Sequence, residues 1–137
     1  MKVRRSLVPV LGIVACVAGN PMAVVAHHSF SNYDMKTDTT LTGTVERFEW
    51  TNPHTYLYLN VSNPDGGTRE WAVEFAAIGH LLRMGITKET FEPGDRVTVV
   101  GHLARNGSNS MTFSSITKAN GKTFGSGPAA SPAASQP

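Results

Sequence analysis

Apolar and polar residues alternate through most of the middle of the chain, which is the pattern of half-buried β-strands. The alternation is clearest over residues 55–61, where Leu57, Leu59 and Val61 fall on one face. Similar segments, rich in Thr, Val and aromatic residues, lie before and after this one. The predicted strands are 41–50, 55–61, 69–75, 96–104 and 111–118, with a short return strand at 123–124.

The period changes once, over residues 76–84, where Ile78, Leu81 and Leu82 fall at helical spacing. Gly85 follows at the position of a C-terminal helix cap, so this segment predicts one short helix. The turns indicated by composition are 51–54, 63–67, 92–95 and 120–121, the last as a type I′ turn.

Three strands, a short helix and two further strands follow one another in the order of an OB fold. That fold is a small five-stranded Greek-key barrel with its helix between the third and fourth strands. We therefore expect an all-β, OB-like domain with one short helix. A β-sandwich is the alternative, and the position of the helix favours the barrel.

Residues 1–26 predict a cleavable signal peptide. Three basic residues among the first five precede an apolar stretch over 7–18, and a small-residue cleavage site ends at Ala26. The apolar stretch is shorter than the about 20 residues that span a bilayer. A membrane anchor or a buried strand is the alternative, but nothing downstream resembles a stop-transfer segment. The mature protein is expected to begin at His27 and to be periplasmic or secreted.

Cys16 supports a second interpretation of the same leader. The small residues ahead of it resemble a lipoprotein cleavage site, and a lipid on Cys16 would anchor the chain to a membrane. The two interpretations predict different mature N-termini.

Composition narrows what the mature chain can do. Residues 27–124 are expected to form one small domain, whereas residues 125–137 are low in complexity, have no large apolar side chain and predict a disordered tail. Cleavage after Ala26 would leave nine basic and ten acidic side chains and no cysteine. With no basic run, nucleic acid is not an expected partner. Neither disulfides nor thiolate metal sites can form.

Several short motifs resemble those of an uncharacterised family of small exported bacterial proteins, a domain of unknown function. The most specific are HHSF at 27–30 and WTNPH at 50–54. The other matching segments are 42–45, 81–85, 93–95 and 105–108. The resemblance implies export, bacterial origin and a compact β domain, but it supplies no activity and no site residues.

All five histidines follow the predicted cleavage site, and His27 would become the N-terminal residue. Its free α-amine and imidazole can chelate a metal, and a second imidazole would complete a three-nitrogen site that suits Cu(II). His28 offers a related chelate through its amide and imidazole nitrogens. His54 is the expected remote ligand, because it lies in a loop that borders the ligand-binding face of an OB fold. The sequence thus predicts a copper site built from His27 with His28 or His54.

A plainer interpretation gives the histidines structural or solvated roles. His27 and His28 would then form a solvated terminus, and His54 would donate a hydrogen bond that shapes the Asn-Pro turn. His80 is expected at the rim or in the core of the domain, and His102 on the solvent side of its strand.

Aromatic side chains support an alternative function without a metal. Tyr56 and Tyr58 point away from the apolar face of their strand and predict an exposed aromatic face. With the loop around Asn52 and His54, this face would bind a saccharide or a protein. Trp71, on the apolar face of the next strand, is expected in the core.

Catalytic motifs are lacking in the sequence, which has no phosphate-binding glycine loop, nucleophile elbow or HExxH motif. Carboxylates at period two on the first and third predicted strands indicate a solvated face. They form an acid–base pair only if those strands come together. These residues are Glu46, Glu49, Glu70 and Glu74. The sequence favours a binding module over an enzyme.

Overall fold

A computed structural model describes residues 30–128. The predicted leader, with Cys16, His27 and His28, lies outside the described residues, as does the chain from residue 129 onward. The elements in chain order are a 3-10 helix η1 (Phe30–Asn32), β1 (Thr39–Glu49), β2 (Thr55–Ser62), β3 (Thr68–Phe75), α1 (Ile78–Arg83), β4 (Arg96–Leu103), β5 (Ser110–Lys118) and β6 (Thr123–Gly125). Neither helix within residues 30–128 is long and apolar enough to span a membrane.

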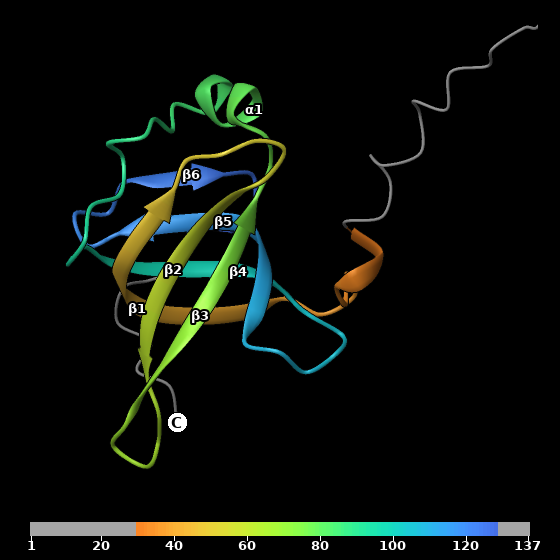
Figure 1. Cartoon of the computed structure of the whole chain (residues 1–137), viewed down its shortest axis with the longest axis vertical. Helices are drawn as coiled ribbons and strands as arrows, with labels where there is room; N and C mark the ends of the chain where they lie inside the picture. Colours follow the sequence, from red (N-terminus) through yellow and green to blue (C-terminus); the bar gives the residue numbers. More distant parts are fainter. Residues whose placement is uncertain (1–29, 129–137) are drawn as a thin grey trace, which may run out of the picture.

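Five strands close into a barrel. β1 pairs antiparallel with both β2 and β4, β3 pairs with β2, and β5 pairs with β4. The barrel closes at a seam where residues 72–74 of β3 pair in parallel with residues 110–112 of β5. α1 follows β3 and lies across one end of the barrel, as Figure 1 shows. This connectivity confirms the predicted OB-like barrel over the β-sandwich, and β6 adds a sixth strand beside β5.

The apolar faces predicted from the alternation meet inside the barrel. Leu57 and Leu59 of β2 and Val73 of β3 are fully buried. α1 contributes only Leu81 to this core, whereas Leu82 is 53% exposed although the sequence pattern included it. A helix of six residues turns one narrow face toward the barrel, so its apolar positions cannot all be buried.

The N-terminal part of the described chain is fastened to the end of β4. Tyr33 forms a β-bridge with Ala104, and the Asp34 amide donates a hydrogen bond to the Leu103 carbonyl at 2.9 Å. The Arg105 Nε donates to the Tyr33 carbonyl oxygen, also at 2.9 Å. These bonds fix where the Tyr33 side chain lies relative to the seam.

The C-terminal hairpin differs from its prediction in the turn. A type I′ turn needs positive φ at both central residues, here Asn120 and Gly121. Gly121 has a φ of 83°, but no non-glycine residue within 30–128, and so not Asn120, has a positive φ. The predicted type I′ turn is therefore wrong. Beyond β6, the amides of Ser126 and Gly127 donate to the Ser114 carbonyl, so the folded chain continues past the predicted domain end at residue 124.

β4 approaches β5 so closely at Gly101 that no side chain fits between them. A Cβ on Gly101 would overlap the backbone carbonyl of Thr112. The pairing of the two strands is irregular at the same place, between Val100 and Gly101. A glycine is thus required by the close contact of two backbones.

The substitution Gly101→Ala is expected to lower the free energy of unfolding by about 1–3 kcal/mol or more, because the obstructing atoms are backbone. The matched control is Gly79→Ala on α1, where an added Cβ meets only Arg83 Nη1 at 3.9 Å. That change should stabilise the protein by about 0.5–1 kcal/mol. Urea denaturation measures both, and a Gly101 variant as stable as the parent would contradict the prediction.

Candidate functional site

Glu74 lies beside the barrel seam and connects three segments of the chain. Its Oε2 accepts a hydrogen bond from the Tyr33 hydroxyl at 2.5 Å, and its Oε1 lies 2.8 Å from His54 Nδ1. Tyr33 is buried and the Glu74 side chain is 13% exposed, so water competes weakly for these bonds. Burial, followed by the bond to the carboxylate, raises the pKa of the Tyr33 hydroxyl, which therefore stays protonated and remains a donor.

The contact with Glu74 decides which nitrogen of His54 is available. Nδ1 lies 2.8 Å from a carboxylate oxygen, which can only accept, so the neutral ring that suits this contact has its proton on Nδ1 and its lone pair on Nε2. The imidazole is 36% exposed, which leaves it open to a ligand. Metal-binding histidines commonly donate their second ring nitrogen to a carboxylate in this way.

Backbone and side-chain hydrogen bonds of the β1–β2 loop set the position of this imidazole. Thr51 Oγ1 donates to the His54 carbonyl at 2.9 Å, and Thr55 Oγ1 donates to the Thr51 carbonyl at 3.2 Å. The turn is therefore held through the backbone of His54. The expectation that its imidazole shapes the turn is wrong, because the ring is directed to Glu74.

Asn52 holds the same loop against α1. Its Oδ1 accepts a hydrogen bond from the Ile78 amide at 3.1 Å, and the peptide bond between Asn52 and Pro53 is cis. The amide at the first position of a helix has no partner within the helix, so Asn52 satisfies it from outside. The side-chain oxygen predicted to bind a ligand is thus bonded to α1.

His54 and Glu74 line a pocket of about 610 Å³. Much of the wall is apolar, and the rings of Phe75 and Phe113 stack there with their centroids 4.3 Å apart. The remaining lining residues are Phe30, Pro53, Ala76, Ala77, His80, Met84, Thr112, Ser114 and Ser126. Segments from both ends of the described chain therefore meet at this pocket.

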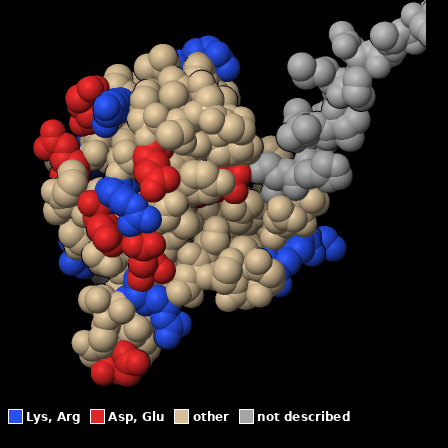
Figure 2. All heavy atoms as spheres, in the orientation of Figure 1, with Lys and Arg blue, Asp and Glu red and all other residues tan. Residues whose placement is uncertain are grey.

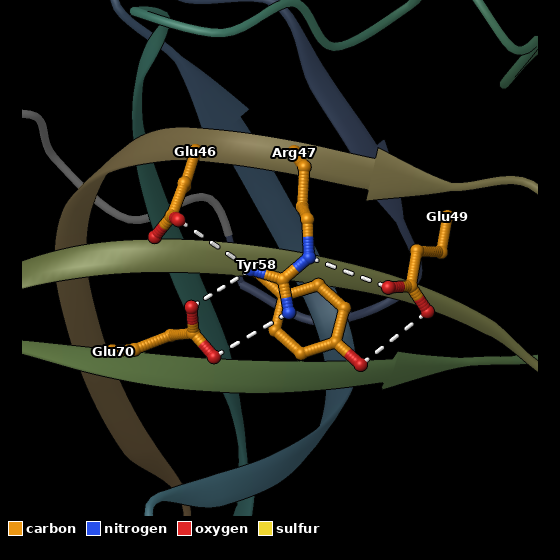
Figure 3. Close-up of polar contacts among 5 residues, drawn as sticks. All are labelled: Glu46, Arg47, Glu49, Tyr58 and Glu70. Carbon is orange, nitrogen blue, oxygen red and sulfur yellow. Dashed lines mark hydrogen bonds and ion pairs between the residues drawn. The ribbon is translucent and has the colours of Figure 1, made fainter.

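On the outer face of β1, β2 and β3, away from the pocket, Arg47 covers the ring of Tyr58. The Arg47 Cζ lies 3.4 Å from the centroid of the Tyr58 ring, and Arg47 Nη1 bonds Glu70 Oε2 at 2.7 Å (Figure 3). Glu46 and Glu49 also contact this guanidinium, at 3.6 and 3.3 Å. Figure 2 shows acidic and basic side chains interleaved over this face. Glu46, Glu49 and Glu70 thus converge on one cation, whereas Glu74 lies at the pocket.

The predicted site residues do not form one cluster. Tyr56 lies beside Tyr58 on the outer face of β2, with ring centroids 6.3 Å apart. Burial raises the pKa of Tyr56, and the charge of Glu74 adds to this effect. Asn52, Tyr56 and Tyr58 do not line the pocket, whereas His54 does. His27 and His28 lie outside the described residues.

Two further histidines complete the set. His80 is exposed on α1 and lines the pocket, with Nδ1 3.4 Å from Arg83 Nη2, in agreement with the expected rim position. His102 is not on a solvent face as expected, because its side chain is only 13% exposed. Its Nδ1 lies 3.1 Å from the Thr37 carbonyl oxygen, since the segment before β1 covers it.

Sequence patterns missed Glu74 and Tyr33. Alternation along the strand places Glu74 on an outward face. Glu74 is covered because the segment before β1, which carries Tyr33, folds back over it. The two residues are 41 positions apart, so no local pattern connects them. Within residues 30–128, no cluster of three or more His, Cys, Asp or Glu side chains could hold a metal ion.

Comparisons with known proteins identify a family but no activity. A model described as "Family of unknown function (DUF6152)" matches residues 13–113. No curated protein is significantly similar in sequence. Two crystal structures of the mitochondrial single-stranded DNA binding protein Rim1 from S. cerevisiae match with TM-scores of 0.47 and 0.45 and identities of 14% and 12%. The matches cover 61% and 60% of this chain, and 93% and 92% of those chains.

Replacing Tyr33 by phenylalanine is expected to lower the free energy of unfolding by about 1–3 kcal/mol, because a shielded carboxylate loses a donor. The matched control is Tyr58→Phe, whose hydroxyl makes only an exposed bond to Glu49 at 3.4 Å. That change should cost about 0.5 kcal/mol or less. Urea denaturation of both variants tests this, and equal losses would show that the Tyr33–Glu74 bond is not special.

Proposed function

The chain belongs to the family of unknown function DUF6152, and since that name carries no activity, we propose from the pocket itself that this is an exported, periplasmic copper-binding module. His54 would supply one nitrogen ligand. Cleavage after Ala26 would supply the others, the α-amine and imidazole of His27. The observation that carries the proposal is the run of close contacts from Tyr33 through Glu74 to His54: a hydrogen bond from the Tyr33 hydroxyl, and a distance of 2.8 Å between Glu74 Oε1 and His54 Nδ1.

The N-terminal ligands are within reach of this imidazole. Phe30 lines the same pocket as His54, and His27 precedes Phe30 by three residues in the sequence. Three residues of extended chain span about 10 Å. We therefore infer that the amine of a protein that begins at His27 reaches His54 with the barrel unchanged. His28 is the alternative ligand from the same segment.

The donors and their surroundings suit Cu(II). Nitrogen ligands in a tetragonal or planar arrangement are typical of that ion. The carboxylate of Glu74 orients the imidazole of His54. Its negative charge also offsets part of the charge of a bound metal. The buried hydroxyl of Tyr33 keeps that carboxylate in place.

The alternative of a saccharide- or macromolecule-binding aromatic face has less support. Arg47 lies over the ring of Tyr58, and Asn52 is bonded to α1, so these residues are engaged within the domain. Carboxylates surround Arg47, which disfavours a phosphate backbone on this face. We therefore propose no nucleic-acid partner. We also propose no catalytic reaction.

The protein that begins at His27 is expected to bind Cu(II) tightly at neutral pH, and one added alanine before His27 should abolish tight binding by moving the amine. His54→Ala should weaken binding at least about tenfold and remove one nitrogen from the Cu(II) electron paramagnetic resonance signal. His102→Gln, which changes a histidine outside the pocket, is the control. Calorimetric titration gives the affinities.

Two outcomes would contradict the copper site. One is unchanged affinity in the chain with the added alanine. The other is an exported protein whose intact mass shows that it begins at Cys16, because lipid attachment there would remove the free amine from His27.

Glu74→Gln is expected to weaken Cu(II) binding by about 10–100-fold while the number of nitrogen ligands stays the same, because Glu74 acts through His54. The matched control is Glu70→Gln on the same strand, which faces Arg47 and not the pocket. Copper titration and paramagnetic resonance of both variants provide the test. An equal loss of affinity in the two would exclude a specific role for Glu74.

A further inference from the structure

We propose that the interior of the pocket is a separate binding site for a small organic cation with an apolar body, such as an arylalkylammonium ion. The site does not require copper or the N-terminal amine. Three properties determine which ligand fits: the size of the pocket, the aromatic surface of its wall and the single formal charge on that wall.

The size of the pocket fits a small molecule. Its volume of about 610 Å³ falls within the about 300–1,000 Å³ that is usual for small-ligand sites. Its walls come from the β1–β2 loop, the end of β3, α1 and β5. An elongated macromolecule would need a groove along the barrel, whereas this pocket is local to one end of the seam.

The apolar part of the wall calls for an apolar body. The stacked rings of Phe75 and Phe113 and the thioether of Met84 line it. Phe30, which also lines the pocket, is 61% exposed. Phe75 is already buried, so an aromatic or alkyl group in the pocket would remove the exposed surfaces of Phe30, Met84 and Phe113 from water, and that burial is the main favourable contribution to binding.

The charge of the wall favours a cation. Glu74 is the one Asp, Glu, Lys or Arg residue among the lining residues. Its carboxylate is mostly shielded, so its field acts through a medium that screens less than bulk water. The partly exposed ring of Phe113 attracts an ammonium group as well. An anionic ligand would meet the same carboxylate without any Lys or Arg in the lining to balance it.

The test compares three probes that share one ring and differ in charge: 2-phenylethylammonium, 2-phenylethanol and phenylacetate. It uses the chain with an added alanine before His27, with a chelator present, at pH 8, where imidazole is ordinarily uncharged. Calorimetric or NMR titration should show the amine binding about tenfold more tightly than the alcohol, and the acid more weakly than both. Glu74→Gln should remove the preference for the amine over the alcohol, whereas Glu70→Gln should preserve that preference.

A second pair of variants locates the binding. Ala77 lines the pocket just before α1, so the large side chain of Ala77→Trp should fill the pocket and abolish binding of every probe. Leu82→Trp on the same helix lies outside the lining and should leave binding intact, provided that both variants show parental melting temperatures. Equal affinities for the three probes, no measurable binding of any, or binding that survives Ala77→Trp would each overturn the proposal. Because copper is excluded throughout, these outcomes are independent of the copper site.

Discussion

The pairing of β3 with β5 closes the barrel and determines where Glu74 lies. Val73 and Phe75 on either side of it face the core, and side chains alternate along a strand, so the carboxylate must face outward at the seam. A shift by one residue would bury it in the core. In the observed register it lies under Tyr33 and beside His54, and the pocket forms around this group. The site thus depends on the register that completes the fold.

Much of the barrel could be predicted because its information is local. Alternation located the strands to within a few residues, and the change of period located α1. Gly85, expected to end that helix, has a φ of 77°, which glycine adopts without strain. The position of this helix between the third and fourth strands then selected the OB-like barrel over a sandwich.

The site could not be predicted to the same extent, because its contacts join distant segments. The chain before β1 folds back along β4, and this single feature buries Tyr33, shields Glu74 and covers His102. The hydrophobic periodicity of the sequence cannot indicate that this segment folds back along β4. The pairing of Arg47 with Tyr58 is similar, since alternation correctly turned the tyrosine outward but could not show that a neighbouring strand would supply a cation to cover it.

Phe30 and Ser126 line the same pocket, so the two ends of the described chain lie close together. A chain joined there by a short linker, and opened instead in the exposed turn between β2 and β3, would keep every strand pairing of the barrel. It would never carry an amine on His27, however. The strand pairings are thus compatible with a circular permutation, whereas the proposed copper site requires that the peptide bond before His27 be cut.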